Sequence, residues 1–243
     1  MAGRRFFLII AILTFSFACS REKPVEPKPP APTPAPTVIL KPKPSLLDEP
    51  QRVSLGFPPH VLASVESAAG AEAEPFYESV LVHSENLKGE QGYERKQLSG
   101  FSVRTKKADE VIASCSSSLR KQGFLIFRSK KNHRNVPDVV TVVRGRNSYD
   151  ILKIQKTEAP NYHLDTKAII AWLKALQKQA PFVITGANVD RVEAKFIKPP
   201  RDMKSFAKKI AGYAPDTVTH VKGSMEELVK YMKKNNGFFL EWD

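Results

Sequence analysis

The chain has 243 residues, of which 42% are hydrophobic and 26% charged, and this composition is typical of one globular domain of middling size or two small ones. Its two cysteines exclude a disulfide-stabilised scaffold and the common four-cysteine zinc modules, so apolar burial must hold the core together. The formal net charge is +13, and no apolar run is long enough for an ordinary transmembrane helix.

The N-terminus has the pattern of an export signal over residues 1–18. Two arginines precede a thirteen-residue apolar stretch, Phe6 to Ala18, and Cys19 follows directly. A cysteine in this place resembles the bacterial lipoprotein signal, in which the cysteine thiol receives a diacylglyceryl group. Ser16 and Phe17 depart from the usual residues of that signal. We expect Cys19 to be lipidated, and a plain signal peptide or an uncleaved short anchor are the alternatives.

Residues 19–50 form a proline-rich linker after this signal. Ten of the nineteen prolines lie between Lys23 and Pro50, among Lys, Glu, Ala and Thr. Such a segment forms neither a helix nor a strand ladder, so we expect a disordered, extended spacer between a lipid anchor and a domain. A proline-rich ligand for a partner domain is the other interpretation.

The composition becomes globular over residues 51–243. In its first part we expect the following elements: a short helix after Pro58-Pro59, a strand over Phe76–His83, a polar loop over Ser84–Ser99, a strand over Phe101–Arg104, and a helix near Lys106–Gln122 that ends at Gly123. Cys115 lies on the apolar stripe of that last helix, so we expect a buried thiol.

The second part of the domain alternates short strands with capped helices. A meander is predicted first, with strands over Phe124–Phe127, Val139–Val143 and Tyr149–Ile154. The later elements are a helix capped by Asp165 and running to Gln177, strands over Phe182–Thr185 and Val192–Phe196, a helix after Asp202 with its exit at Gly212, a helix opened by a capping box at Ser224, and a terminal strand over Phe238–Trp242. This order predicts an α+β fold with helices packed on a mixed or antiparallel sheet.

Several short sequence motifs in the C-terminal half, over about residues 138–243, are similar to those of a bacterial family catalogued as domain of unknown function 4253. They are Tyr149-Asp150-Ile151-Leu152, Lys156 to Tyr162, Gly186 to Glu193, Pro199-Pro200, Ala214-Pro215-Asp216 and Leu240 to Asp243. The family more often has cysteine at the position of Ala214, so a reactive cysteine there is not part of this protein's mechanism. The resemblance implies a module and no particular reaction.

Catalytic and cofactor motifs are missing from the sequence. It contains no His-Glu-x-x-His, Gly-x-Ser-x-Gly, P-loop or dinucleotide fingerprint, and its five histidines are scattered. We therefore expect no cofactor and no metal site. The weak catalytic candidates are the carboxylates of Asp190, Glu193 and Asp216, which would need to converge in a cleft to act as a hydrolytic pair.

Two further sets of residues are candidate binding groups. The first set belongs to the motifs that resemble the family. It consists of Thr157, Asn161 and Tyr162, which precede a helix, and of Trp242 and Asp243 at the C-terminus. The second is the basic segment 101–134, in which nine Lys and Arg face two acidic residues; its candidate contacts are Arg120, Lys121, Arg128, Lys130, Lys131 and Arg134. That segment is interpreted as a solvated helix face, as a surface for anionic lipid, lipopolysaccharide or cell-wall polymer, or as a nucleic-acid site.

The export signal argues against nucleic acid as the partner. We therefore expect a non-enzymatic envelope lipoprotein, anchored to the membrane through lipid, at the outer membrane facing the periplasm. Its basic face would contact an anionic envelope component or a protein partner. The alternatives are an envelope hydrolase that uses the C-terminal carboxylates, and an immunity-like module that binds another protein.

Overall fold

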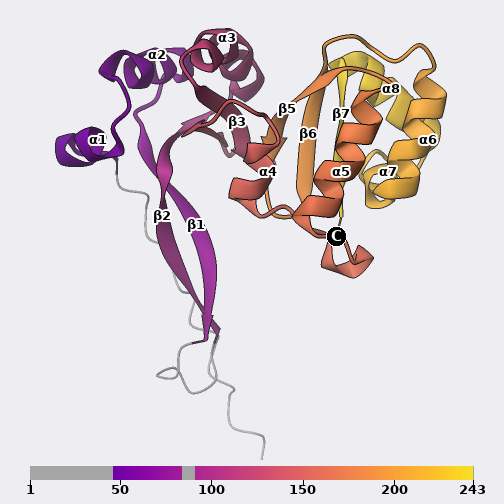
Figure 1. Cartoon of the computed structure of the whole chain (residues 1–243), viewed down its shortest axis with the longest axis horizontal. Coiled ribbons are helices and arrows are strands. Elements are labelled where there is room, and N and C mark those ends of the chain that lie inside the picture. The colour runs from indigo at the N-terminus through magenta and orange to yellow at the C-terminus, as the bar shows by residue number, and fades with distance from the viewer. Residues whose placement is uncertain (1–45, 84–90, 243) are drawn as a thin grey trace, which may run out of the picture. The chain divides into compact units, whose positions relative to one another are not determined.

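The computed structural model describes residues 46–83 and 91–242. This part of the chain is an α+β fold with a seven-stranded mixed sheet, in the strand order β1-β2-β4-β3-β5-β6-β7 (Figure 1). All strand pairs are antiparallel except β3 with β5, which is parallel. The predicted fold class is confirmed.

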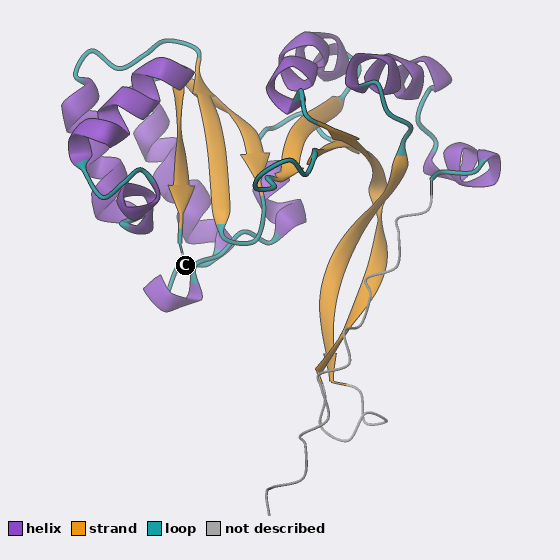
Figure 2. Ribbon diagram, turned by 180° about the vertical axis from the view of Figure 1, so that it is seen from behind, coloured by secondary structure: helices purple, strands orange, loops and turns teal. Residues whose placement is uncertain are grey.

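The first half of the described chain contributes one end of the sheet and three helices. Its elements are α1 (Glu49–Leu55), α2 (Pro59–Ala69), β1 (Glu74–His83), β2 (Gln91–Thr105), α3 (Ala108–Lys121), β3 (Phe124–Lys130) and β4 (Asp138–Arg144). Strands β1 and β2 form a long two-stranded ribbon that extends beyond β3 and β4 (Figure 2).

The second half contributes the other end of the sheet and the remaining helices. Its elements are α4 (Asp150–Gln155), the 3-10 helix η1 (Pro160–Tyr162), α5 (Thr166–Gln177), β5 (Phe182–Ala187), β6 (Arg191–Phe196), α6 (Met203–Tyr213), α7 (Asp216–His220), α8 (Met225–Asn235) and β7 (Gly237–Glu241). Side chains cap three of these helices as predicted, because Asp165, Asp202 and Ser224 accept hydrogen bonds from Ala168 N, Ser205 N and Glu227 N.

Two apolar cores lie on opposite faces of β3. Phe124 and Ile126 belong to the core that packs against α1, α2 and α3, whereas Leu125 and Phe127 belong to the core that includes α4, α5, α6 and α8. Because successive strand residues face opposite sides, a strand covered on both faces is a continuous apolar run. The buried thiol of Cys115 lies in the first core, as predicted.

Three expectations about elements are wrong, and residues 47–50, which were expected in the linker, belong to the folded part, because Leu47 is buried in the first core and α1 begins at Glu49. Residues 149–154 do not form a third meander strand, because α4 occupies them, and β4 pairs with β2 and β3 instead. A short apolar run fits a helix as well as a strand, and here the adjacent residues Ile151 and Leu152 are both buried in one turn of helix.

The second error concerns the polar loop expected over Ser84–Ser99. Residues from Gln91 onward belong to β2, and their backbone pairs in register with β1, for example Lys96 with Glu78. This strand is held by its ladder partner and not by an alternating apolar pattern, so sequence periodicity does not reveal it. Residues 84–90 lie outside the described part.

The third error concerns Gly212, which was expected to end its helix. Helix α6 continues through Tyr213 and is capped at Ala214. The ring of Tyr213 stacks on Trp172 with centroids 3.9 Å apart, so the last turn is fixed by an aromatic contact.

Candidate functional site

Glu193 on β6 is the centre of a buried network of ion pairs. Arg128 Nη1 on β3 donates to Glu193 Oε2 at 2.5 Å, and Arg191 Nε donates to Glu193 Oε1 at 3.1 Å. Both arginine side chains are only 8% exposed. The sheet order brings β3 and β6 to either side of β5, so residues 65 apart in sequence share one carboxylate.

Each arginine extends the network to another element. Arg128 reaches Asp109 at the start of α3, at 2.9 Å, and Asp138 at the start of β4, at 3.0 Å. Arg191 Nη1 donates to Glu241 Oε2 on β7 at 2.6 Å, and its guanidinium lies 4.2 Å from the ring centroid of Phe239. The network therefore ties the central strands β3 and β4, the strands β6 and β7, and α3 together.

The positive charges of this network lower the pKa of two of its carboxylates, Glu193 and Asp109. Burial alone would raise the pKa of Glu193, but the nearby charges of Arg128, Arg191 and Lys131 outweigh burial and hold that pKa below its ordinary value. The pKa of Asp109 is lowered in the same way, because the charge and hydrogen bond of Arg128 outweigh burial. A carboxylate of this kind is a poor general acid or base near neutral pH.

The space beside Glu193 is too small for a substrate. A cavity of about 10 Å³ lies there, lined by Arg128, Ser129, Lys131, Ala187, Asn188, Arg191 and Glu193. This volume is of the order needed for one water molecule. The arrangement is consequently that of a structural ion-pair network.

The other two candidate carboxylates have different surroundings. Asp190 lies in the turn between β5 and β6, where its backbone N–H donates to Asn188 Oδ1. Asp216 begins α7 and accepts a hydrogen bond from the Tyr162 hydroxyl at 2.7 Å. Neither residue lines the cavity beside Glu193.

The candidate residues from the family-like motifs make local contacts. Thr157 is fully buried and its hydroxyl donates to Asn188 O at 2.6 Å, while Asn161 is exposed in η1. Trp242 is 3% exposed, and its indole N–H donates to Tyr213 O at 3.1 Å. The ring of Trp242 thus packs in the core. Two other candidates, Cys19 and Asp243, lie outside the described residues.

The basic residues of segment 101–134 do not form one patch. Arg128 is buried in the network, in contrast to its expected place on a basic surface. The other five candidate contacts of this segment are exposed. Arg120 and Lys121 lie at the end of α3 next to the start of β3, and Lys130, Lys131 and Arg134 lie at or beyond the other end of β3. A seven-residue strand separates the two groups by roughly 20 Å.

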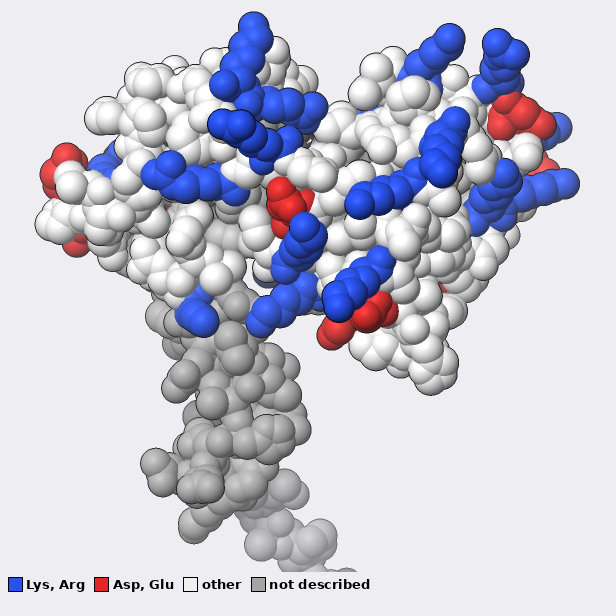
Figure 3. Space-filling view, viewed as in Figure 1, with Lys and Arg blue, Asp and Glu red and all other residues white. Residues whose placement is uncertain are grey.

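Basic side chains are also present on the second half of the fold. In Figure 3 lysines and arginines are spread over the visible face, with acidic residues among them. Lys204 and Lys208 are exposed on α6, and Lys230 and Lys233 are exposed on α8. None of these four lysines is among the candidate residues predicted from the sequence.

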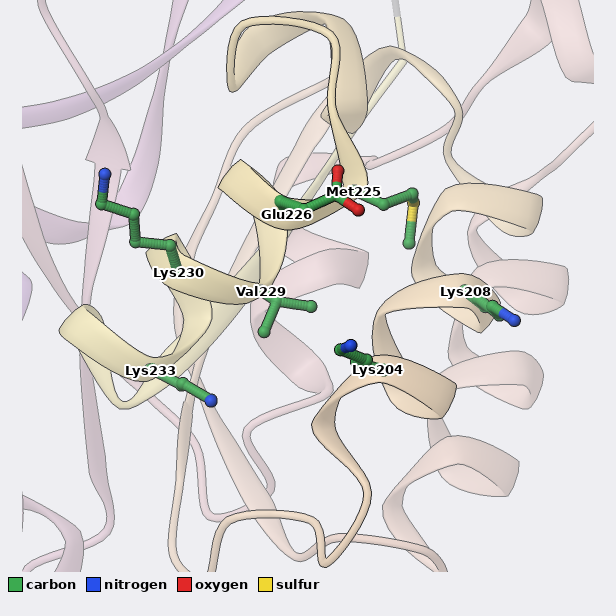
Figure 4. Close-up of a pocket in the computed structure, with 7 residues that line it drawn as sticks. All are labelled: Lys204, Lys208, Met225, Glu226, Val229, Lys230 and Lys233. Carbon is green, nitrogen blue, oxygen red and sulfur yellow. The ribbon is translucent and has the colours of Figure 1, made fainter.

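These four lysines line a groove between α6 and α8. Its volume is about 600 Å³, and its other lining residues are Met225, Glu226 and Val229. Met225 and Val229 point from α8 toward α6 (Figure 4). The sequence signal was a helical spacing of four, which connects Lys204 with Lys208 and Met225 with Val229 and Lys233. We call this feature the lysine groove.

Comparison with known proteins finds a family match for one region of the chain. Residues 139–243 match the family described as domain of unknown function DUF4253. The DUF4253 region contains Arg191, Glu193 and the whole lysine groove, whereas Arg128 and Asp109 precede it. The ion-pair network therefore joins the DUF4253 region to the segment before it. No curated protein and no solved structure matches the chain significantly.

Two further observations concern the described residues. None of their groups of His, Cys, Asp and Glu is placed to hold a metal ion. Among the helices of the same residues, none has the length and apolar character needed to cross a membrane.

Proposed function

We propose that the chain is a lipid-anchored protein of the bacterial cell envelope, at the outer membrane facing the periplasm, and that its folded part is a non-catalytic interaction module. Two arginines, a thirteen-residue apolar stretch and Cys19 support the anchor, and the proline-rich sequence that precedes α1 supports a spacer between anchor and domain.

The surroundings of Glu193 favour a binding function over a catalytic one. Each of its two oxygens accepts a hydrogen bond from a buried arginine, and the adjacent cavity has room for about one water molecule. Paired catalytic acids need a shared space between them, whereas Asp190 and Asp216 contact other residues. This geometry gives a hydrolase little support.

The exposed basic residues supply the contacts of such a module. Lys130 and Arg134 lie at one end of β3 and face solvent, and Lys131 beside them is partly engaged by Glu193, at 3.8 Å. Near an anionic membrane or polymer, each Lys or Arg contributes about 1 kcal/mol of attraction. An anionic envelope component or an acidic protein surface is the partner chemistry that this charge favours.

Fractionation of cells that express cysteine variants tests the anchor. We expect Cys19→Ser to move the protein from the membrane fraction to a soluble fraction, because the acyl chains that bury in the bilayer are lost. Cys115→Ser is the matched control, since that thiol is buried in the first core, and it should stay with membranes. Membrane association of the Cys19→Ser protein equal to wild type would contradict the proposal.

A further inference from the structure

The lysine groove has an apolar floor with a charged rim. Met225 and Val229 are half-buried and pack against the second core, whereas the four lysines at the margins are exposed. Lys204 and Lys233 extend toward the space between the two helices from opposite sides (Figure 4). The groove therefore offers a recessed apolar strip between two cationic edges.

The charge of the groove is largely unneutralised. Lys230 forms an ion pair with Glu227 at 3.3 Å, whereas the other three lysines form no ion pair with the described residues. Glu226 is the single acidic residue of the lining. A cleft with an excess of one sign of charge concentrates ligands of the opposite sign, so an anionic occupant is favoured.

The shape of the groove distinguishes between anionic occupants. A flat bilayer surface would meet the exposed lysines and leave the recessed floor uncovered, and a small polyanion would gain nothing from Met225 and Val229. A helix laid between α6 and α8 covers the floor with its apolar stripe and places its flanking side chains beside the lysines. Helices α6 and α8 each have eleven residues, which corresponds to about 16 Å of helix.

We propose that the lysine groove binds an acidic amphipathic helix of a protein partner. The helix carries apolar residues four apart, which contact Met225 and Val229, and Asp or Glu on both sides of that stripe, which pair with Lys204, Lys208 and Lys233. This proposal rests on the proposed role of the domain as an interaction module, and it names the chemistry of the partner.

Selection from a random peptide library tests this assignment without assuming a partner sequence. The probe is a library of peptides of about twelve residues displayed on a helical scaffold, since this length matches α6 and α8. The target is the full chain in a non-ionic detergent. Selected peptides are then titrated against wild type, the groove variant Lys204→Glu/Lys233→Glu and the control variant Lys209→Glu/Lys234→Glu, which has the same charge change on the same helices outside the groove.

We expect the enriched peptides to be acidic, with apolar residues four apart. Their affinity should fall about tenfold or more for the groove variant, because two attractive contacts become repulsive, and should stay within about twofold for the control variant. Circular dichroism establishes that both variants are folded.

Three results would overturn the proposal: no enrichment, enriched peptides without an acidic excess, or equal loss of affinity in the two variants. Binding of phosphatidylglycerol vesicles that requires Lys204 and Lys233 while peptides fail to bind would assign the groove to lipid instead. None of these measurements depends on Cys19, so failure here and failure of the anchor test are distinguishable.

Discussion

At the scale of single residues, Glu193 is the residue on which most contacts of the ion-pair network depend. Replacement by glutamine keeps its size and removes its charge, which leaves Arg128 and Arg191 buried without their shared carboxylate. Arg128 keeps Asp109 and Asp138 as partners, and Arg191 keeps Glu241, so the loss is smaller than that of a fully broken buried pair. We therefore expect Glu193→Gln to lower the free energy of unfolding by about 1.5–3 kcal/mol in urea denaturation, the range for a lost hydrogen bond to a charged group.

The control for this variant is Glu158→Gln, which makes the same chemical change at an exposed side chain. It should change the free energy of unfolding by less than about 0.5 kcal/mol. An effect of Glu193→Gln as small as that of the control would mean that the network does not stabilise the fold.

The lowered pKa of Glu193 predicts a pH dependence of stability. The folded state binds a proton at this carboxylate less readily than the unfolded chain, whose value is near 4.5. The contribution of Glu193 is therefore complete above about pH 4.5 and is lost as the pH falls through the lower pKa of the folded state. In urea denaturation from pH 7 to pH 3, the difference between wild type and Glu193→Gln should shrink as the pH falls, and a constant difference would contradict this assignment.

At the scale of elements, sequence patterns predicted the long capped helices and the apolar strands. The stripe of α3 and the caps at Asp165 and Asp202 are local signals, so they are legible in the sequence. The short helix α4 and the polar strand β2 were missed because the first has too few residues to show a period and the second depends on its pairing with β1.

Two glycines in the second half of the fold predict opposite effects of the same substitution. A Cβ on Gly237 in β7 would clash with Ala194 O on β6, whereas a Cβ on Gly212 in α6 meets nothing within 4 Å. Gly237→Ala should therefore destabilise the protein by at least about 1–3 kcal/mol, because the two strands must move apart. Gly212→Ala should stabilise it by roughly 0.5–1 kcal/mol, since alanine favours the helix.

Thermal unfolding of the two glycine variants checks this pair. The melting temperature should fall for Gly237→Ala and rise for Gly212→Ala relative to wild type. A lower melting temperature for Gly212→Ala would contradict the helical position of Gly212 and would favour the expected helix end at this residue.

At the scale of the whole molecule, the candidate site was only partly visible in the sequence. The sequence identified Glu193 as a candidate residue, but the role of this carboxylate depends on Arg128. Arg128 lies 65 residues earlier in the chain and is close to Glu193 only because the strand order places β3 and β6 on either side of β5. The lysine groove was missed because its two edges come from separate helices, and neither edge alone differs from an ordinary solvated helix face.

We propose that the chain works outside the cytosol as a lipid-anchored module. Mass spectrometry of the N-terminal peptide of the protein, purified from its native membranes, distinguishes a processed and lipidated chain from an uncleaved one. We predict a peptide that begins at Cys19 and carries the added mass of a diacylglyceryl group, with a further acyl chain where the amine is also modified. A soluble chain that still begins at Met1 or Ala2 would contradict it.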